Sequence, residues 1–301
     1  MVSEIELAGL TGSSPIGIMA ALGVLRIASS KLYQYRPKIY WREQDDWVPV
    51  LVTDIEIECE SLVSSIYAHL EQEKKDFFDD DDIRMKPEVF VEKAAKILYS
   101  STYSIRTKAD FWAAFGSELA IDKSKGLIKP TDFYMASGQQ KFLNKVKNAM
   151  NSVNKSKIME ALFESWKYKD DHSLAMGWDP NTYRMHAFRS REPSTDNSPL
   201  CEVAAEWLAY ESLPLFPTLA EGKKRITSGF IGDYFIWPIW VRPSDESSIR
   251  SLLLSSEVFD ETLRGNLQQR GVAAIYGSRR MEFAKGYGSF QPGELIWAPT
   301  A

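Results

Sequence analysis

The longest apolar stretch of the chain lies near its amino end and has the pattern of a buried helix. Residues 16–27 are apolar at nearly every position, and they follow a Gly-Leu-Thr-Gly-Ser-Ser-Pro turn. Pro15 suits the first helical turn because it lacks an N–H group that would have no partner there, and either preceding serine can cap that end. Gly17 and Gly23 each destabilise a helix by about 1 kcal/mol relative to Ala, so we expect another backbone to approach closely there. The pattern predicts a central helix that is buried on all sides.

The segments that follow predict both strands and helices. Strands are expected at 38–41 and 47–53 as a hairpin, at 183–188, at 225–241 as paired strands around Gly232-Asp233, and at 272–276. Helices are expected at 61–70, 87–98, 109–119, 137–153, 159–166, 201–213 and 247–254, the one at 201–213 amphipathic. The opening order of strand, helix and hairpin indicates an α+β fold. We expect a mixed or antiparallel sheet packed against the buried N-terminal helix and a helical middle region.

Length and composition set the expected domain organisation. With 301 residues, 44% of them hydrophobic, the chain can bury one large core. We expect a single elaborated domain over 1–301, with two tightly packed lobes as the alternative: 1–70 with 170–301 as an α/β lobe, and 71–169 as a mainly helical one. Residues 71–85, which contain four consecutive aspartates, predict a solvated linker.

Charge and cysteine content narrow the class of protein. The net charge of −5 excludes a uniformly basic coat for nucleic acid but permits a local basic face. Cys59 and Cys201 are far apart and form no CxxC motif, which favours reduced thiols in a cytoplasmic protein. His69 and His172 have no ligand partner at a metal-binding spacing, so we expect no metal site and no cofactor. The apolar run at the amino end is too short to span a membrane.

Basic residues gather in three places along the chain. The lysines on the helix expected at 137–153 have two interpretations: an ordinary solvated face, or a stripe that contacts phosphates. Lys155 and Lys157 extend this positive charge along the chain. If the strands at 183–188 and 272–276 are neighbours, the arginines near them line one basic groove, with Tyr183 available to stack on bases. The predicted nucleic-acid-binding residues are Lys141, Lys145, Lys147, Arg184, Arg189, Arg191, Arg279, Arg280, Lys285 and Tyr287.

Two other hypotheses rest on single features. His186 lies among arginines and can act as a general base on a ribose hydroxyl while the cations stabilise the phosphate, which is the chemistry of a metal-independent ribonuclease. No second acid or base accompanies it, so packing within a strand is the favoured interpretation. Alternatively, Trp237, Trp240 and Phe290 form a docking patch for a protein partner.

Several longer phrases occur together in an order that resembles one known family. They are LAGLTGSSPIGIMAALGVLRI at 7–27, MASGQQKFL at 135–143, WDPNTYRMHAFRSREPS at 178–194, AAEWLAYESLPLFP at 204–217, FIWPIW at 235–240 and RGVAAIYGSRRMEFAKGYG at 270–288. The chain resembles a CRISPR-associated protein of type I-G (formerly I-U) systems, of the family described as the extension of the CRISPR helicase-nuclease. The resemblance covers nearly the whole chain.

What this resemblance implies is a biological context rather than a set of catalytic residues. It implies work alongside a crRNA-guided effector complex and a helicase-nuclease. We therefore expect a non-catalytic component of a CRISPR-Cas antiviral defence system that binds RNA or single-stranded DNA, or docks on one of those partners, in the cytoplasm. A ribonuclease acting on CRISPR or target RNA and a pure protein-interaction module remain the alternatives.

Overall fold

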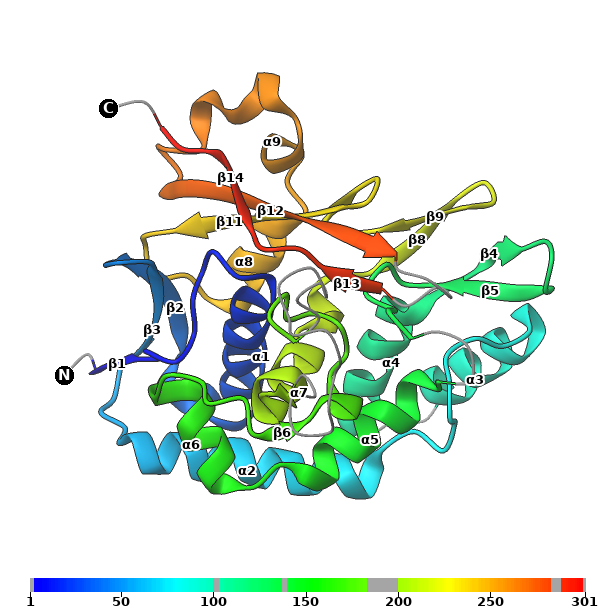
Figure 1. The fold of residues 1–301 in the computed structure, drawn as a ribbon, viewed down its shortest axis with the longest axis horizontal. Helices are drawn as coiled ribbons and strands as arrows, with labels where there is room; N and C mark the ends of the chain where they lie inside the picture. The colour runs from blue at the N-terminus through cyan, green and yellow to red at the C-terminus, as the bar shows by residue number, and fades with distance from the viewer. Residues whose placement is uncertain (1–2, 100–102, 137–139, 183–199, 283–287, 300–301) are drawn as a thin grey trace, which may run out of the picture.

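Two buried helices form the centre of the fold (Figure 1). The computed structural model describes residues 3–99, 103–136, 140–182, 200–282 and 288–299. In α1 (Pro15–Lys31) every side chain as far as Ala28 is buried, and in α7 (Val203–Glu211) all are buried. The predicted central helix is confirmed, with Ser14 at its N-cap position. The amphipathic character predicted for 201–213 is wrong, because α7 has no solvent-facing side.

The backbones of α1 and α7 touch at a glycine. A Cβ atom added at Gly23 would lie 1.8 Å from the carbonyl oxygen of Leu208, so only glycine fits there. Gly17 is similarly restricted, because its added Cβ would lie 2.1 Å from the carbonyl oxygen of Thr11. The close approach predicted from the two glycines is confirmed.

Two antiparallel sheets border this helical pair. The smaller has the order β1-β3-β2 and consists of β1 (Ser3–Glu6), β2 (Lys38–Glu43) and β3 (Trp47–Thr53). The larger has the order β10-β11-β12-β13, with β14 also paired to β12; its strands are β10 (Phe230–Ile231), β11 (Tyr234–Trp240), β12 (Val272–Glu282), β13 (Gly288–Phe290) and β14 (Glu294–Trp297). The indole N–H groups of Trp237 and Trp240 donate to the carbonyl oxygens of Gly12 and Ile39, each at 2.8 Å. These bonds tie the larger sheet to the amino-terminal region, and the mixed α+β class is confirmed.

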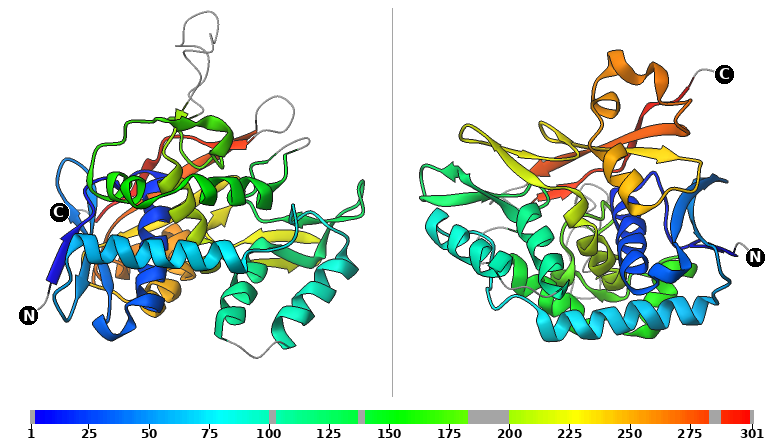
Figure 2. Two further views of the ribbon diagram at one scale, coloured as in Figure 1. Left: turned by 90° about the horizontal axis from the view of Figure 1, so that it is seen from below. Right: turned by 180° about the vertical axis from the view of Figure 1, so that it is seen from behind.

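The remaining helices surround the central pair. Their bounds are α2 (Cys59–Asp76), α3 (Pro87–Tyr99), α4 (Tyr103–Phe115), α5 (Phe142–Ser152), α6 (Lys155–Phe163), α8 (Glu246–Leu253) and α9 (Ser256–Phe259), with short 3₁₀ helices η1 (Tyr33–Tyr35), η2 (His172–Leu174), η5 (Leu213–Leu215) and η6 (Glu261–Asn266). The long helix α2 crosses the side of the molecule opposite the larger sheet (Figure 2). One continuous cluster of buried hydrophobic residues runs from Ile5 to Phe290 through most of these elements.

Part of the segment expected to be a solvated linker is built into the fold. Helix α2 continues to Asp76, and Asp82 is buried. The Asp82 carboxylate accepts hydrogen bonds from the guanidinium of Arg84 at 2.9 Å and from the main-chain N–H of Phe142 at 3.3 Å. Asp82 therefore fixes the start of α5, which corrects the prediction for this aspartate.

Two β-hairpins project side by side at one end of the molecule (Figure 1). One is formed by β4 (Gly116–Asp122) and β5 (Leu127–Pro130), the other by β8 (Thr218–Glu221) and β9 (Lys224–Thr227), and a short pair is formed by β6 (Asp170–Asp171) and β7 (Leu200–Cys201). The helix predicted at 109–119 ends at Phe115, because the chain turns into β4 and pairs with β5. Leu119 is consequently 58% exposed rather than buried on a helical face.

Replacing Gly23 by Ala tests the contact between α1 and α7. The added methyl group overlaps the Leu208 backbone, so we expect the variant to lose about 3 kcal/mol or more of unfolding free energy in urea titrations. The matched control is Gly265→Ala, whose added Cβ meets nothing within 4 Å and which we expect to change stability by less than about 0.5 kcal/mol. Equal stability of the two variants would contradict the backbone contact.

Candidate functional site

The lysines predicted on 137–157 do not form one outward stripe. Lys147 on α5 and Lys141 at its N-cap position are exposed, whereas Lys145 on α5 is half-buried. Burial lowers the pKa of Lys145, and the carboxylate of Glu206 on α7 opposes that shift. Lys145 is therefore less accessible to a phosphate than Lys141 and Lys147. The exposed Lys155 lies over the ring of Tyr67 on α2, with its nitrogen 5.7 Å from the ring centre.

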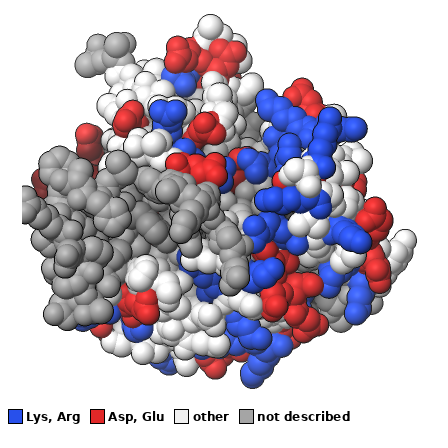
Figure 3. Space-filling view, turned by 45° about the vertical axis from the view of Figure 1, so that its right-hand side comes forward, with Lys and Arg blue, Asp and Glu red and all other residues white. Residues whose placement is uncertain are grey.

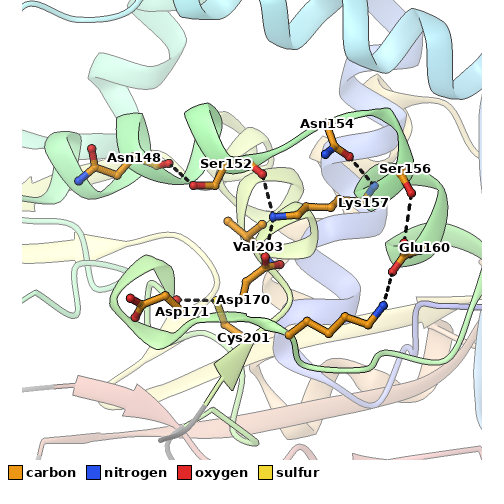
Figure 4. Close-up of polar contacts among 11 residues, drawn as sticks. Asn148, Ser152, Asn154, Ser156, Lys157, Glu160, Asp170, Asp171, Cys201 and Val203 are labelled. Atoms are coloured by element: carbon orange, nitrogen blue, oxygen red, sulfur yellow. Dashed lines mark hydrogen bonds and ion pairs between the residues drawn. The ribbon is translucent and has the colours of Figure 1, made fainter. Parts of the chain in front are cut away.

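Lys157 is neutralised within the fold, as Figure 4 shows. Its ammonium donates to the carboxylate of Asp170 at 2.6 Å and to the carbonyl oxygen of Ser152 at 2.9 Å. The same carboxylate accepts from the main-chain N–H of Val203, at 3.2 Å, where α7 begins. Because these bonds join α6 to the start of α7, we assign Lys157 a structural role instead of the predicted extension of a phosphate-binding stripe.

Arg279 and Arg280 lie on opposite faces of β12, because neighbouring residues of a strand alternate. Arg279 is exposed. Arg280 is half-buried, with one guanidinium nitrogen 3.7 Å from the Asp132 carboxylate and another donating to the carbonyl oxygen of Tyr134 at 3.2 Å. The two arginines therefore do not act on one surface.

The rest of the predicted groove lies outside the described residues. This holds for Arg184, His186, Arg189, Arg191, Lys285 and Tyr287, and also for Tyr183. Their convergence on one groove stays a prediction, and so does a catalytic role for His186.

The prediction of an aromatic docking patch on the surface is wrong. Trp237, Trp240 and Phe290 are only 0%, 2% and 3% exposed. They pack in the core beneath the larger sheet, where the indole groups hold the amino-terminal segment. No partner protein can reach them without unfolding.

A basic surface that the sequence analysis did not propose as a binding site lies on the two projecting hairpins, one of which contains the basic, glycine-containing segment at 123–130. Figure 3 shows Lys and Arg side chains gathered on this side of the molecule. We define the hairpin surface as Lys123, Lys125 and Lys129 of the β4–β5 hairpin with Lys223 and Lys224 of the β8–β9 hairpin. Within the described part of the chain, none of these five ammonium groups forms an ion pair or a hydrogen bond. Their charge is therefore available to a ligand.

Local sequence explains why each hairpin turns where it does. The backbone φ angle is +64° at Gly126 and +58° at Gly222, a left-handed conformation that glycine adopts without steric cost. Lysines flank both glycines, in the phrases KSKG and GKK. A glycine turn flanked by lysines between short apolar segments was the signal available in the sequence.

A chain of hydrogen bonds joins the bases of the two hairpins. The Thr218 hydroxyl at the start of β8 donates to the carbonyl oxygen of Ala114 in α4, at 2.8 Å. It also lies 3.2 Å from the hydroxyl of Thr227 in β9, which accepts from the main-chain N–H of Asp132 at 2.9 Å. Because these groups are buried, the hairpins are held in a fixed relation to each other.

A pocket of about 610 Å³ opens between β5, β9 and the β10–β11 turn. Its lining is Lys129, Asp132, Lys224, Arg225, Ile226, Thr227, Phe230, Ile231, Gly232 and Asp233. Arg225 is fixed in this wall, because its guanidinium donates to the carbonyl oxygen of Pro130 at 2.7 Å and to the Asp132 carboxylate. Burial lowers the pKa of Arg225, and Asp132 opposes that shift. The pocket thus joins the hairpin surface to a preformed arginine-carboxylate pair.

A separate buried cluster of charges lies between α1, α2 and α7. The Glu211 carboxylate accepts from the Arg26 guanidinium at 2.9 Å, and the Nε2 atom of His69 lies 3.2 Å from it. Burial alone raises the pKa of Glu211, but His69 and Arg26 outweigh it, so the net shift is downward. Glu73 is half-buried beside this cluster, and burial, followed by the Glu211 charge, raises the pKa of Glu73 to about 7.

The Glu73→Gln variant tests this cluster through its pH dependence. Wild-type Glu73 holds its proton more tightly when folded, so its contribution to stability is complete below about pH 4.5 and is lost as the pH rises toward about 7. Glutamine cannot ionise. We expect the variant to gain, relative to wild type, on the order of 1–3 kcal/mol of unfolding free energy between about pH 5 and 8.

Urea titrations across that pH range measure this gain, and Glu60→Gln, on the exposed first turn of the same helix, is the matched control. A difference between Glu73→Gln and wild type that does not vary with pH would contradict the upward shift in the pKa of Glu73.

Among the described residues, no three His, Cys, Asp or Glu side chains come together in a group that can hold a metal ion. None of the described helices has the length and apolar character needed to cross a bilayer. Neither a protein-family model nor a curated protein sequence matches the chain.

Proposed function

We propose that this chain is a non-catalytic, nucleic-acid-binding component of a CRISPR-type antiviral defence system. The context comes from the resemblance of its sequence phrases to a type I-G CRISPR-associated family. The proposed ligand is RNA or single-stranded DNA, and the proposed protein partner is the effector complex or the helicase-nuclease of such a system.

The observation that carries the proposal is the unpaired charge of the hairpin surface. The chain has a net charge of −5, and several of its other basic side chains, including Arg26, Lys157 and Arg280, lie against carboxylates. The five lysines of the hairpin surface outnumber the three carboxylates on the same two hairpins, those of Glu118, Asp122 and Glu221, so the hairpins have a net positive charge within an acidic protein. Phosphates are the natural ligand for this pattern, because each phosphate contact releases condensed counterions.

The chemistry of the hairpin surface favours contact with the sugar-phosphate backbone of a nucleic acid rather than recognition of its bases. Lysine ammonium groups bind phosphate as point charges, without the paired donors that read a base edge. The buried hydrogen bonds at the bases of the hairpins hold the backbone that carries these lysines, so only the side chains have to be ordered on binding. We therefore propose that the hairpin surface supplies affinity that depends weakly on sequence.

The Lys123→Ala/Lys223→Ala variant, which removes one lysine from each hairpin tip, tests this proposal. We expect about tenfold weaker binding to a single-stranded RNA, because two exposed charge contacts are lost. The slope of log affinity against log salt should become shallower by roughly 1.4. Fluorescence anisotropy at several salt concentrations measures both quantities.

The matched control removes two exposed lysines from elsewhere, as Lys31→Ala/Lys75→Ala, at the carboxyl ends of α1 and α2. It loses the same net charge, so its affinity measures the effect of charge alone. Equal affinity of the two double variants for RNA would contradict the proposal, and so would an absence of RNA and DNA binding by the wild-type chain.

A further inference from the structure

We infer that the pocket beside the hairpin surface binds a single nucleotide that carries a terminal phosphate. This inference rests on the proposed function and extends it, because it assigns a specific ligand to a place where the surface is hollowed. The volume of about 610 Å³ is within the range of small-molecule sites.

The lining of the pocket contains two chemically different kinds of side chain, as a nucleotide has two chemically different ends. Lys129, Lys224 and Arg225 contribute positive charge. Ile226 and Ile231, which are 37% and 47% exposed, contribute apolar surface together with the half-buried ring of Phe230. A phosphate fits the cationic side chains, and a nucleobase fits the apolar ones.

The aromatic part of the lining is rigid. The ring of Phe230 stacks on Phe290, with ring centres 6.1 Å apart and planes at 27°, and it meets Phe133 edge to face at 4.9 Å. Both of these partners are buried in the core. A base that stacks on Phe230 therefore finds a surface already in place, which is how single-stranded nucleic acid is commonly held.

The charge of the pocket favours a terminal phosphate over a phosphate within a strand. The lining of the pocket carries positive charge on Lys129, Lys224 and Arg225 and negative charge on Asp132 and Asp233, and the Arg225 guanidinium is paired with the Asp132 carboxylate. The ammonium groups of Lys129 and Lys224, which form no ion pair within the described residues, match a phosphate monoester, with about −1.5 to −2 at pH 7, better than a diester with a single charge.

The carboxylates of the pocket have different roles. Asp132 is engaged by two guanidinium groups, those of Arg225 and Arg280, and so holds these two side chains in place. Asp233 is exposed in the β10–β11 turn, and within the described residues its carboxylate forms no ion pair or hydrogen bond. That carboxylate is available to accept hydrogen bonds from a ribose hydroxyl or a base amino group.

Calorimetric titration of the wild-type chain with AMP, adenosine and inorganic phosphate tests the inference. We expect AMP to bind more tightly than either of the others, because only AMP contacts both the cationic and the apolar side chains. An absence of AMP binding would overturn the inference. Equal affinity for AMP and inorganic phosphate, or for AMP and adenosine, would also overturn it, since one of the two kinds of side chain would then contribute nothing.

Adjacent lysines provide a matched pair of variants. Lys224 lines the pocket, whereas Lys223, its neighbour in the chain, does not. We expect Lys224→Ala to weaken AMP binding about tenfold and Lys223→Ala to leave it unchanged. Ile226→Ser, which removes apolar surface from the pocket lining, should weaken AMP but not inorganic phosphate. Equal effects of Lys224→Ala and Lys223→Ala on AMP affinity would contradict the assigned site.

Single-stranded RNAs with a 5′-phosphate or a 5′-hydroxyl identify the source of the nucleotide. Tighter binding of the phosphorylated strand, lost in Lys224→Ala, supports a strand end as the ligand, and equal binding of the two strands with AMP still bound supports a free nucleotide. The Lys123→Ala/Lys223→Ala variant separates the two proposals. If only the proposal for the hairpin surface is wrong, the chain still binds AMP. If only the proposal for the pocket is wrong, the chain still binds RNA but does not bind AMP.

Discussion

The fold depends on the direct contact between the backbones of α1 and α7. Gly23 allows the two helices to meet at the carbonyl of Leu208, at a distance that no side chain permits. Beside this contact, the buried Arg26 and Glu211 form an ion pair at 2.9 Å. Such a pair adds little net stability, because both charges lose their water, but an unmatched partner would be strongly unfavourable. The backbone contact and the ion pair can therefore form together in only one alignment of the two helices.

This alignment determines where the basic hairpins lie. Helix α7 leads through η5 directly into β8, and α4 leads directly into β4. The bond between Thr218 and Ala114 joins the two hairpins where they leave the core. The surface charge is thus carried by elements whose bases are buried, and the pocket beside them has a wall, Phe230, that packs on core aromatics. Rigid placement of exposed lysines is what the proposed function requires.

The sequence predicted those features that depend on local pattern. The buried helix at 16–27, its closely packed glycines and the β2–β3 hairpin follow from apolar periodicity and turn residues, and each is confirmed. Tertiary contacts decided the rest. Lys157 was predicted to extend a basic stripe, yet its ammonium pairs with the Asp170 carboxylate, and Lys145 of the same predicted stripe is half-buried. The position of a lysine along its helix does not show which carboxylate will lie beside it in the fold.

The hairpin surface was missed for a related reason. Its lysines come from two segments about a hundred residues apart, and neither segment has more than three lysines. Only the pairing of β4 with β5 and of β8 with β9, side by side, brings the charges together. By contrast, adjacent residues such as Arg279 and Arg280 suggest a shared site but alternate across a strand. Charge density along the chain is therefore a poor guide to charge density on the surface.

Amide hydrogen exchange of the chain with and without single-stranded RNA tests the central claim most directly. The account predicts slower exchange at 118–131 and 218–233, which contain the two hairpins and the pocket, and unchanged exchange in α5 and α6. Slower exchange confined to 142–163, with the hairpins unaffected, would contradict it and return the lysines of those helices to the role first predicted for them.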